Sequence, residues 1–370
     1  MKKDKIFILV FCAMIFLPAV FLDTKSEVSK AEKRNMAKLP HLIENGKISG
    51  KFFEGSYYES YFNDRFGGRE EFARAESFIE SKLVAFPFSD RAIKGKNGWL
   101  FFIDKNDGDN AQDFLKRNLL DERKAAIFRE NVRKTADFCR KNKIKFLFLI
   151  GPNKHSVYPE NYPLDERPDG ITRADQISRI FKEMDIACVF PRDYLISCKT
   201  KDSLPLYYET DTHWNPLGAF RAFEKLKIEI EKMFPDTVFP EIKYEIKSQT
   251  DYTVRDLMPM LRIGKMKSTN VTLFPAGKTG GTAENSDFYK YLKNEGIKGV
   301  HTVSAGKSLP RALIYRDSFF SSLEPFVSPL FSEAEYIWKR FGKEDESYVN
   351  EYKPDIIIFE AVERAAPSIY

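Results

Sequence analysis

The feature of this chain that most constrains its fold is an alternation of short apolar runs with helical patterns of apolar residues. Five runs have the length of buried strands, at residues 144–150, 186–190, 311–315, 334–338 and 355–360. Helical spacing of apolar residues occurs around and between them, at 121–142, 172–184, 215–230, 319–326 and 344–352. Strands that alternate with helices pair in parallel and are covered by helices on both faces. The chain is therefore predicted to have an α/β fold with a mainly parallel sheet.

Three of the predicted helices begin with residues that favour a helix N-terminus. Asp121 can cap the first of them, and Thr172 with Asp175 has the spacing of a capping box. Asn215 followed by Pro216 combines a capping residue with proline at the first helical position. The segment just before Asn215 is therefore predicted to be a loop that leads into a helix.

The N-terminus has the pattern of a membrane signal. Three lysines precede an apolar run from Ile6 to Leu22, and no small-residue cleavage site follows it. About 17 apolar residues reach the lower limit for a membrane-spanning helix, so an uncleaved anchor is favoured. We expect the rest of the chain to lie outside the cytoplasm, in the periplasm or at the cell surface. The expected parts are a signal anchor or transmembrane helix at 1–22, a polar stalk at 23–50, and a folded domain at 51–370 with an insertion at about 241–308.

Composition excludes several classes of function. The 59 basic and 54 acidic residues give a net charge of only +5, so nucleic acid is not expected as a partner. The sequence has no paired zinc-type cysteines and no glycine-rich phosphate loop. Cys188 and Cys198 can pair, although buried thiols are the favoured interpretation.

Two motifs supply candidate chemistry. Asp211 and His213 are two residues apart, so in an extended segment both side chains lie on one side and the carboxylate can hold the imidazole in one tautomer. Ser318 follows an apolar strand and opens a helix, which is a common position for an exposed nucleophile. Ligands bind at the carboxyl ends of parallel strands, where Ser318 is placed. The alternative interpretations are a helix cap for Ser318 and a packed core residue for His213.

The motifs also resemble a known family. DTHWNP at 211–216, IYRDSF at 314–319, PNKHSVYPE at 152–160, YFNDRF at 61–66 and PDIIIFE at 354–360 are similar to the alginate O-acetyltransferase J and X group. This group includes DHHW-type proteins, and Thr212 stands where their second letter is histidine. The resemblance implies a three-layer α/β/α SGNH-hydrolase-like domain in which the Asp-x-His motif precedes the serine.

The resemblance also implies roles for individual residues. Ser318 would be the nucleophile, His213 the general base and Asp211 its orienting partner. The backbone of Ser318 is the expected oxyanion donor, with the side chains of Asn153 or Arg340 as further candidates. His155 is expected to be structural or to face the substrate.

The implied function is transfer of an acetyl group through an acyl-serine onto hydroxyls of a secreted or cell-surface polysaccharide. A multipass membrane-bound O-acyltransferase would deliver the acetyl group, and the N-terminal anchor would hold the chain at the membrane. The implied reaction requires neither a metal nor a bound cofactor. Two alternatives use the same fold. One is a carbohydrate acetylesterase with the same triad, because transfer and hydrolysis differ only in whether a sugar or water reaches the acyl-serine. The other is a non-catalytic cell-surface assembly protein.

Overall fold

The computed structural model describes nine stretches of the chain in two compact units. The described residues are 22–29, 34–44, 46–66, 89–164, 168–275, 282–285, 299–304, 308–342 and 345–368. The larger unit consists of Asp90–Leu257 and Met266–Tyr370, and the smaller one of the chain up to Ser89 together with Met258–Lys265. All candidate site residues belong to the larger unit.

The larger unit is built on a seven-stranded sheet with the order β11-β12-β14-β13-β15-β7-β8. The strands are β7 (Lys145–Gly151), β8 (Ala187–Val189), β11 (Thr282–Asn285), β12 (Gly299–Val303), β13 (Arg311–Tyr315), β14 (Glu333–Ile337) and β15 (Ile356–Val362). The five strands from β14 to β8 are the five predicted from the sequence, and they pair in parallel. The α/β fold with a mainly parallel sheet is therefore present.

The other two strands were not predicted. β12 pairs antiparallel with β14, and β11 pairs antiparallel with β12, so both lie at one edge of the sheet. The sequence analysis placed them in the insertion at 241–308, because they break the alternation of strands with helices. Edge pairing relies on backbone hydrogen bonds, which leave little pattern in the sequence.

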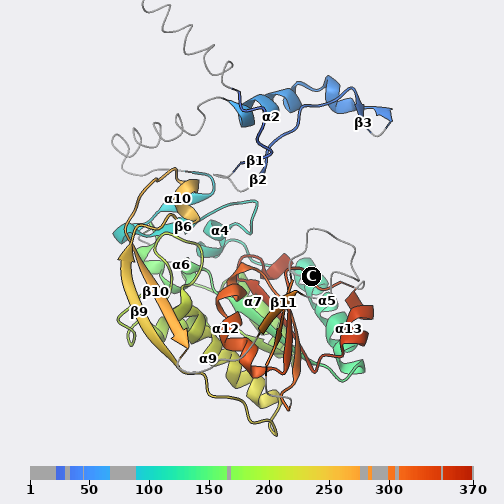
Figure 1. The fold of residues 1–370 in the computed structure, drawn as a ribbon, viewed down its shortest axis with the longest axis vertical. Helices are drawn as coiled ribbons and strands as arrows, with labels where there is room; N and C mark the ends of the chain where they lie inside the picture. The colour runs from blue at the N-terminus through green and yellow to red at the C-terminus, as the bar shows by residue number, and fades with distance from the viewer. Residues whose placement is uncertain are drawn as a thin grey trace, which may run out of the picture. The chain divides into compact units, whose positions relative to one another are not determined.

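Alternate residues of each strand point to two separate apolar cores, one on each face of the sheet. Leu147 and Leu149 of β7 pack with helix α9 (Pro216–Met233), whereas Phe148 and Ile150 face the opposite side. That opposite core is closed by α5 (Glu122–Lys141), α7 (Arg173–Glu183) and α13 (Glu346–Tyr352). Figure 1 shows α9 and α12 on one side of the strands and α5 and α13 on the other, which is the expected three-layer arrangement.

The predicted helix starts are present. Asp121 accepts a hydrogen bond from the Lys124 backbone N–H at 2.7 Å, and Thr172 forms a complete capping box with Asp175. Asn215 accepts from two backbone N–H groups of the first turn of α9, whose first residue is proline. This cap fixes where the preceding loop ends.

The predicted helix at 319–326 is different in the structure. A 3₁₀ segment at Ser318–Ser322 is followed by the short helix α12 at Glu324–Val327. Pro325 explains the break, because proline cannot donate to the previous turn and its ring clashes with the carbonyl four residues earlier. The nucleophile candidate therefore starts a tight turn and not a long helix.

Shorter elements complete the larger unit. They are β5 (Ala92–Lys94), β6 (Leu100–Phe102), α4 (Asn110–Phe114), α6 (Lys154–Val157), α8 (Arg192–Cys198), β9 (Tyr244–Asp251) and β10 (Ser268–Pro275). β5 with β6 and β9 with β10 form antiparallel pairs, and the second pair occupies the start of the predicted insertion. Cys188 and Cys198 are free thiols, so the alternative disulfide is not formed.

The smaller unit holds the predicted polar stalk. Two short antiparallel pairs lie there, β1 (Val28–Ser29) with β2 (Arg34–Asn35) and β3 (Ile43–Glu44) with β4 (Lys47–Ile48), followed by helix α2 (Gly55–Arg65). Helix α10 (Leu257–Met260) begins at the border of the two units. Residues 1–21 of the predicted anchor lie outside the described residues. Among the helices that are described, none has the length and apolar character needed to cross a membrane.

Candidate active site

The Asp-x-His motif lies on a short loop that leads into α9. A β-bridge between Tyr207 and Trp214 closes this loop, and the Asn215 cap fixes its exit. Ser318 comes from the opposite direction, at the start of the 3₁₀ turn that follows β13. The three candidate residues therefore meet where β13 ends and α9 begins.

The side chains of Asp211, His213 and Ser318 form a continuous hydrogen-bonded chain. His213 Nδ1 lies 2.6 Å from Asp211 Oδ1, and His213 Nε2 lies 2.7 Å from Ser318 Oγ. The backbone N–H of His213 also donates to Asp211 Oδ1, at 3.1 Å. An ionised Asp211 can only accept, so Nδ1 carries the proton and Nε2 is free to accept the Ser318 hydroxyl proton. This is the geometry that a serine nucleophile and its general base require.

The charge state of Asp211 agrees with this assignment. Burial alone would raise the pKa of the Asp211 carboxyl, but the hydrogen bond from His213 and the charge of its ring hold that pKa well below the ordinary value. Asp211 is therefore ionised at neutral pH and stabilises a positive charge on His213 when the ring takes a proton. The side chain of His213 keeps 27% of its surface exposed, so small molecules can reach it.

Ser318 is not the helix cap that one alternative proposed. Asp317 has that role, because its Oδ1 accepts from the Phe319 backbone N–H at 2.8 Å. Asp317 Oδ2 accepts from the Val362 N–H at 2.7 Å, and Glu360 accepts from the Asp317 N–H at 2.9 Å. Burial and the nearby Asp317 charge raise the pKa of Glu360 well above its ordinary value. These contacts tie the turn to β15 and leave the Ser318 hydroxyl free for His213.

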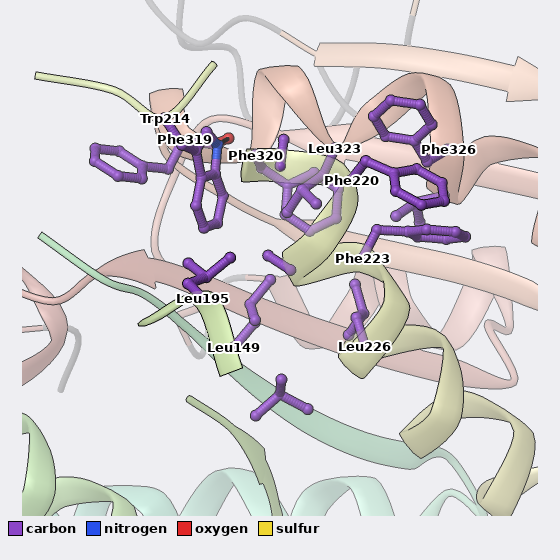
Figure 2. Packing of buried hydrophobic residues seen from close by; sticks show 14 of the residues in the cluster. Leu149, Leu195, Trp214, Phe220, Phe223, Leu226, Phe319, Phe320, Leu323 and Phe326 are labelled. Atoms are coloured by element: carbon purple, nitrogen blue, oxygen red, sulfur yellow. Dashed lines mark hydrogen bonds between the residues drawn. The ribbon is translucent and has the colours of Figure 1, made fainter. Parts of the chain in front are cut away.

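Trp214 joins the two halves of the site. Its indole Nε1 donates to the Phe319 carbonyl at 2.9 Å, and the two rings meet edge to face with centroids 5.3 Å apart. Figure 2 shows Trp214 beside Phe319, with Phe320 next along the same packed layer. Trp214 follows His213 and Phe319 follows Ser318, so this buried contact fixes the neighbours of base and nucleophile together.

A buried lysine that the sequence analysis did not select is hydrogen-bonded to the loop that carries Asp211 and His213. Lys154 Nζ donates to the carbonyls of Tyr208 and Glu209 at 3.1 Å and to that of Asp211 at 2.6 Å. Its ammonium lies over the rings of Trp99 and Phe101. Burial lowers the pKa of Lys154 to about 7, despite the opposing pull of nearby carboxylates. Lys154 therefore completes the backbone hydrogen bonding of a loop that has no regular structure.

A second carboxylate, from Asp256, lies beside the triad. Asp256 Oδ1 accepts from the Thr212 backbone N–H at 2.8 Å, and Oδ2 accepts from the Thr212 hydroxyl at 2.5 Å. Asp256 Oδ2 is 3.8 Å from His213 Nδ1. Burial, and then the charge of Asp211, raise the pKa of Asp256. Asp256 follows the β9 strand within the predicted insertion, where no local motif marks it.

Asp211, His213 and Asp256 offer ligand atoms that lie within 4.8 Å of one another. A cation bound by these atoms would need His213 Nδ1 as a ligand. That nitrogen already forms the 2.6 Å hydrogen bond to Asp211 Oδ1. We therefore assign the two carboxylates to holding the imidazole.

The geometry agrees with comparisons to known proteins. Residues 92–275 match the family model described as SGNH hydrolase-like domain, acetyltransferase AlgX. Over 227 residues the chain is 24% identical to the probable alginate O-acetylase AlgJ of Pseudomonas syringae pv. tomato. The chain therefore resembles the AlgJ and AlgX group. The alignment covers 60% of this chain and 54% of that relative, so the chain matches about half the length of the AlgJ protein.

The solved structure of a Bacillus cereus protein shows a similar fold. PatB1 of Bacillus cereus with a sulfonyl adduct has a TM-score of 0.55 at 14% identity, covering 73% of this chain and 94% of that one. The O-acetyltransferase domain of Pseudomonas putida AlgJ has a TM-score of 0.47 at 16% identity, covering 75% of this chain and 92% of that one. The resemblance to the AlgJ and AlgX group that was predicted from the motifs is confirmed.

The remaining candidate site residues, Asn153 and Arg340, differ in their contacts. Asn153 is buried, its backbone N–H donates to Glu363 at 2.8 Å, and its side-chain Nδ2 has no hydrogen-bond partner among the described residues. Arg340 donates to the carbonyl and hydroxyl oxygens of Ser368, and no contact in the described part of the chain joins it to the triad. Asn153 therefore remains a candidate donor, whereas Arg340 is engaged elsewhere.

His155 is a buried packing residue. Its ring meets Phe114 edge to face with centroids 5.8 Å apart and lies 6.0 Å from the ring of Tyr162. Burial lowers the pKa of His155 to about 3, so the ring is neutral at physiological pH. It also borders a polar cavity lined by Asp113, Lys116 and Arg192. Of the two roles expected for His155, the structural one fits these contacts.

Proposed function

We propose that this protein is an O-acetyltransferase that carries an acetyl group on Ser318 and passes it to a hydroxyl of a secreted or cell-surface polysaccharide. The observation that carries this proposal is the 2.7 Å contact between His213 Nε2 and Ser318 Oγ, with Nδ1 held by Asp211. A solvated serine has no such base within reach. The arrangement is the one that makes a hydroxyl nucleophilic at neutral pH.

The proposed reaction has two steps. His213 Nε2 takes the Ser318 proton while Oγ attacks the acetyl carbonyl, and the donor leaves with that proton, so an acetyl ester forms on Ser318. A sugar hydroxyl then loses its proton to Nε2 and attacks the ester, which restores the serine. Asp211 stays ionised throughout and stabilises the imidazolium between the proton transfers.

The oxyanion of each step needs hydrogen-bond donors. The Phe319 N–H is occupied by Asp317, so the backbone N–H of Ser318 is the donor that the turn leaves available. A second candidate is Nδ2 of Asn153, which follows β7 and has no hydrogen-bond partner among the described residues. We propose the Ser318 N–H as the main donor, with Asn153 in support.

The biological setting follows from the relatives. The P. syringae relative is named as a probable alginate O-acetylase, which supports a polysaccharide acceptor for this chain. The basic and apolar N-terminus supports attachment to a membrane with the folded units outside the cytoplasm. We further propose that a multipass membrane-bound O-acyltransferase supplies the acetyl group.

The direct test is Ser318→Ala in the purified protein with a chromogenic acetyl ester. We expect turnover to fall by roughly 10³-fold or more, because the nucleophile is lost, with an unchanged unfolding midpoint. Ser322→Ala, in the same 3₁₀ turn, is the matched control and should retain full activity. Equal turnover of Ser318→Ala and the unmodified protein would overturn the proposal.

A second measurement separates transfer from hydrolysis. Oligosaccharide fragments of acetylated and deacetylated surface polysaccharides are added to the same assay, and the products are identified by mass spectrometry. Acetylated sugar that depends on Ser318 supports transfer. Release of acetate alone, at a rate that no sugar changes, would favour the acetylesterase.

A further inference from the structure

The loop that carries His213 presents two carboxylates to the same ring nitrogen. Asp211 Oδ1 contacts Nδ1 directly at 2.6 Å, whereas Asp256 Oδ2 is 3.8 Å away. The Thr212 hydroxyl lies between them, 2.5 Å from Asp256 Oδ2 and 3.0 Å from His213 Nδ1. We propose that Asp256, acting through Thr212, is a second positioning residue that holds His213 in its reactive tautomer. This inference rests on the proposed function and adds a residue to it.

The direction of the hydrogen bonds decides what this arrangement does. Asp256 accepts from Thr212 at both of its oxygens, from the backbone N–H at Oδ1 and from the hydroxyl at Oδ2. The Thr212 proton is thereby directed away from the ring, and the hydroxyl lone pairs remain for Nδ1–H. Nδ1–H is then held by two acceptors, Asp211 Oδ1 and Thr212 Oγ1. Both favour a proton on Nδ1 and an open lone pair on Nε2, which faces Ser318.

The two carboxylates are not equivalent. Asp211 makes the shorter contact, and the pKa of its carboxyl is held below the ordinary value, so it supplies most of the charge beside the ring. Asp256 is buried more deeply, with 14% of its side chain exposed, and its pKa is raised by burial and by Asp211. Its effect on His213 passes mainly through the hydroxyl of Thr212. Asp211 therefore makes the larger contribution to holding the proton on Nδ1, and Asp256 with Thr212 favours the same tautomer.

Thr212 makes this arrangement a property of this chain's own loop. DHHW-type proteins have histidine at the second position of the motif, and that side chain lacks a hydroxyl. Here Thr212 is 7% exposed, and both its hydroxyl and its backbone N–H are taken by Asp256. A threonine selected only for packing would not need an ionisable partner 44 positions along the chain.

The arrangement predicts how substitutions combine. Asp211→Asn should cost about 10²-fold in kcat/KM, less than the roughly 10⁴-fold loss seen where one carboxylate orients the histidine alone. Thr212→Val keeps the shape of the side chain but removes the hydroxyl, and by itself should cost about 3-fold because Asp211 still holds Nδ1–H. In the Asp211→Asn background the same change should cost about 30-fold, since neither a carboxylate nor a hydroxyl then lies within hydrogen-bonding distance of Nδ1 and the new amide can donate to it instead.

Controls separate positioning from a general effect on the loop. Thr212→Ser keeps the hydroxyl and should restore activity to within about 2-fold. Thr210→Val makes the matched change two residues earlier, at a buried hydroxyl that has no partner among the described residues, and should leave kcat/KM unchanged in both backgrounds. The inference is wrong if Thr212→Val has the same effect with and without Asp211, or if Thr210→Val matches it.

A spectroscopic measurement tests the inference without using activity. With ¹⁵N-labelled histidine, the NMR signals of His213 should report a proton on Nδ1 in the unmodified protein and in Asp211→Asn. In Asp211→Asn/Thr212→Val and in Asp211→Asn/Asp256→Asn the proton should move to Nε2. The Asp256→Asn amide can donate to Thr212 Oγ1, which frees the hydroxyl proton for Nδ1 and favours the other tautomer.

The outcomes keep the inference apart from the proposed function. An unmodified protein that shows the Nδ1 tautomer but no Ser318-dependent turnover would overturn the function and leave the positioning role standing. Ser318-dependent turnover combined with an unchanged tautomer in both double variants would overturn the positioning role alone.

Discussion

The two faces of the central sheet differ in how close their buried cores lie to the candidate catalytic residues. On the face covered by α9, the core includes Trp214, Phe319 and Phe320 (Figure 2), and the ring of Phe319 lies 4.9 Å from that of His213. On the face covered by α5, α7 and α13, the core is closed by Phe148, Phe181 and their neighbours. The sequence of β7 serves both faces, because alternate residues of one strand belong to different cores.

The difference shows where stability and chemistry are coupled in this protein. Contacts on the α9 side are made by residues next to His213 and Ser318, so a change there alters the distance between them as well as the packing. The apolar core on the α5 side lies on the other face of the sheet from these contacts. We therefore expect substitutions on the α5 side to lower stability without altering catalysis by the folded molecules.

The largest expected effect on stability is Phe148→Ala, on the face away from the site. Phe148 is completely buried and its ring stacks on Phe181 with centroids 4.6 Å apart. Its loss should lower the free energy of unfolding by about 3–5 kcal/mol, through lost burial and the cavity left behind. Urea unfolding measures this, and ester hydrolysis per folded molecule should stay unchanged. A larger fall in turnover than in folded fraction would show that the two faces are not independent.

Lys154→Met tests the site side and has a characteristic pH dependence. The pKa of Lys154 is about 7 in the folded protein against an ordinary value of 10.5, so between these values the unfolded chain binds more protons. The stability of the unmodified protein should therefore gain from Lys154 as pH rises from about 7 towards 10.5, and this contribution should be absent from the variant.

Replacing Lys154 also removes the amino group that hydrogen-bonds to the loop carbonyls. We expect Lys154→Met to lower the free energy of unfolding by about 2 kcal/mol at pH 9, and turnover to fall more than stability does. Urea unfolding of both proteins at pH 7 and pH 9 gives the comparison. Parallel pH dependence in the two proteins would contradict the assignment of the titrating group.

The smallest effect is expected from Thr172→Ala at the start of α7, again on the α5 side. Thr172 accepts from the Asp175 N–H at 3.1 Å and its own N–H donates to Asp175 at 2.7 Å. Removing the hydroxyl should lower the free energy of unfolding by about 1 kcal/mol, because one N–H of the first turn loses its partner. Thermal unfolding measures the loss, and ester turnover serves as the control. A fall in turnover at full folding would place α7 closer to the chemistry than its contacts indicate.

Most of the sheet was predictable because each parallel strand is a local apolar run. The same holds for the helix starts, since a cap and the N–H group it binds are a few residues apart in sequence. The two antiparallel edge strands were not predicted, because their sequences, TAEN and GVHTV, are not apolar runs. The helix after β13 was predicted too long, since the apolar pattern continues through Pro325 while the backbone does not.

The candidate site was predictable only in part, for the same reason. Asp211 and His213 are neighbours on one loop, and Ser318 ends a recognisable strand, so each half of the triad has a local signature. Lys154 and Asp256 have none. Lys154 reaches Asp211 across 57 positions of sequence and Asp256 reaches Thr212 across 44, and the charge of each makes it look like a surface residue.

The sequence by itself determined the strand and helix pattern, the family motifs and the residue types able to carry acyl transfer. These are encoded in short windows, where spacing alone fixes which side chains share a face. Only the tertiary structure decided that His213 Nε2 meets Ser318 Oγ at 2.7 Å and that a second carboxylate lies beside the ring. Such contacts join distant segments, and they form because the packing of α9 against the sheet, with Trp214 bound to Phe319, brings those segments together.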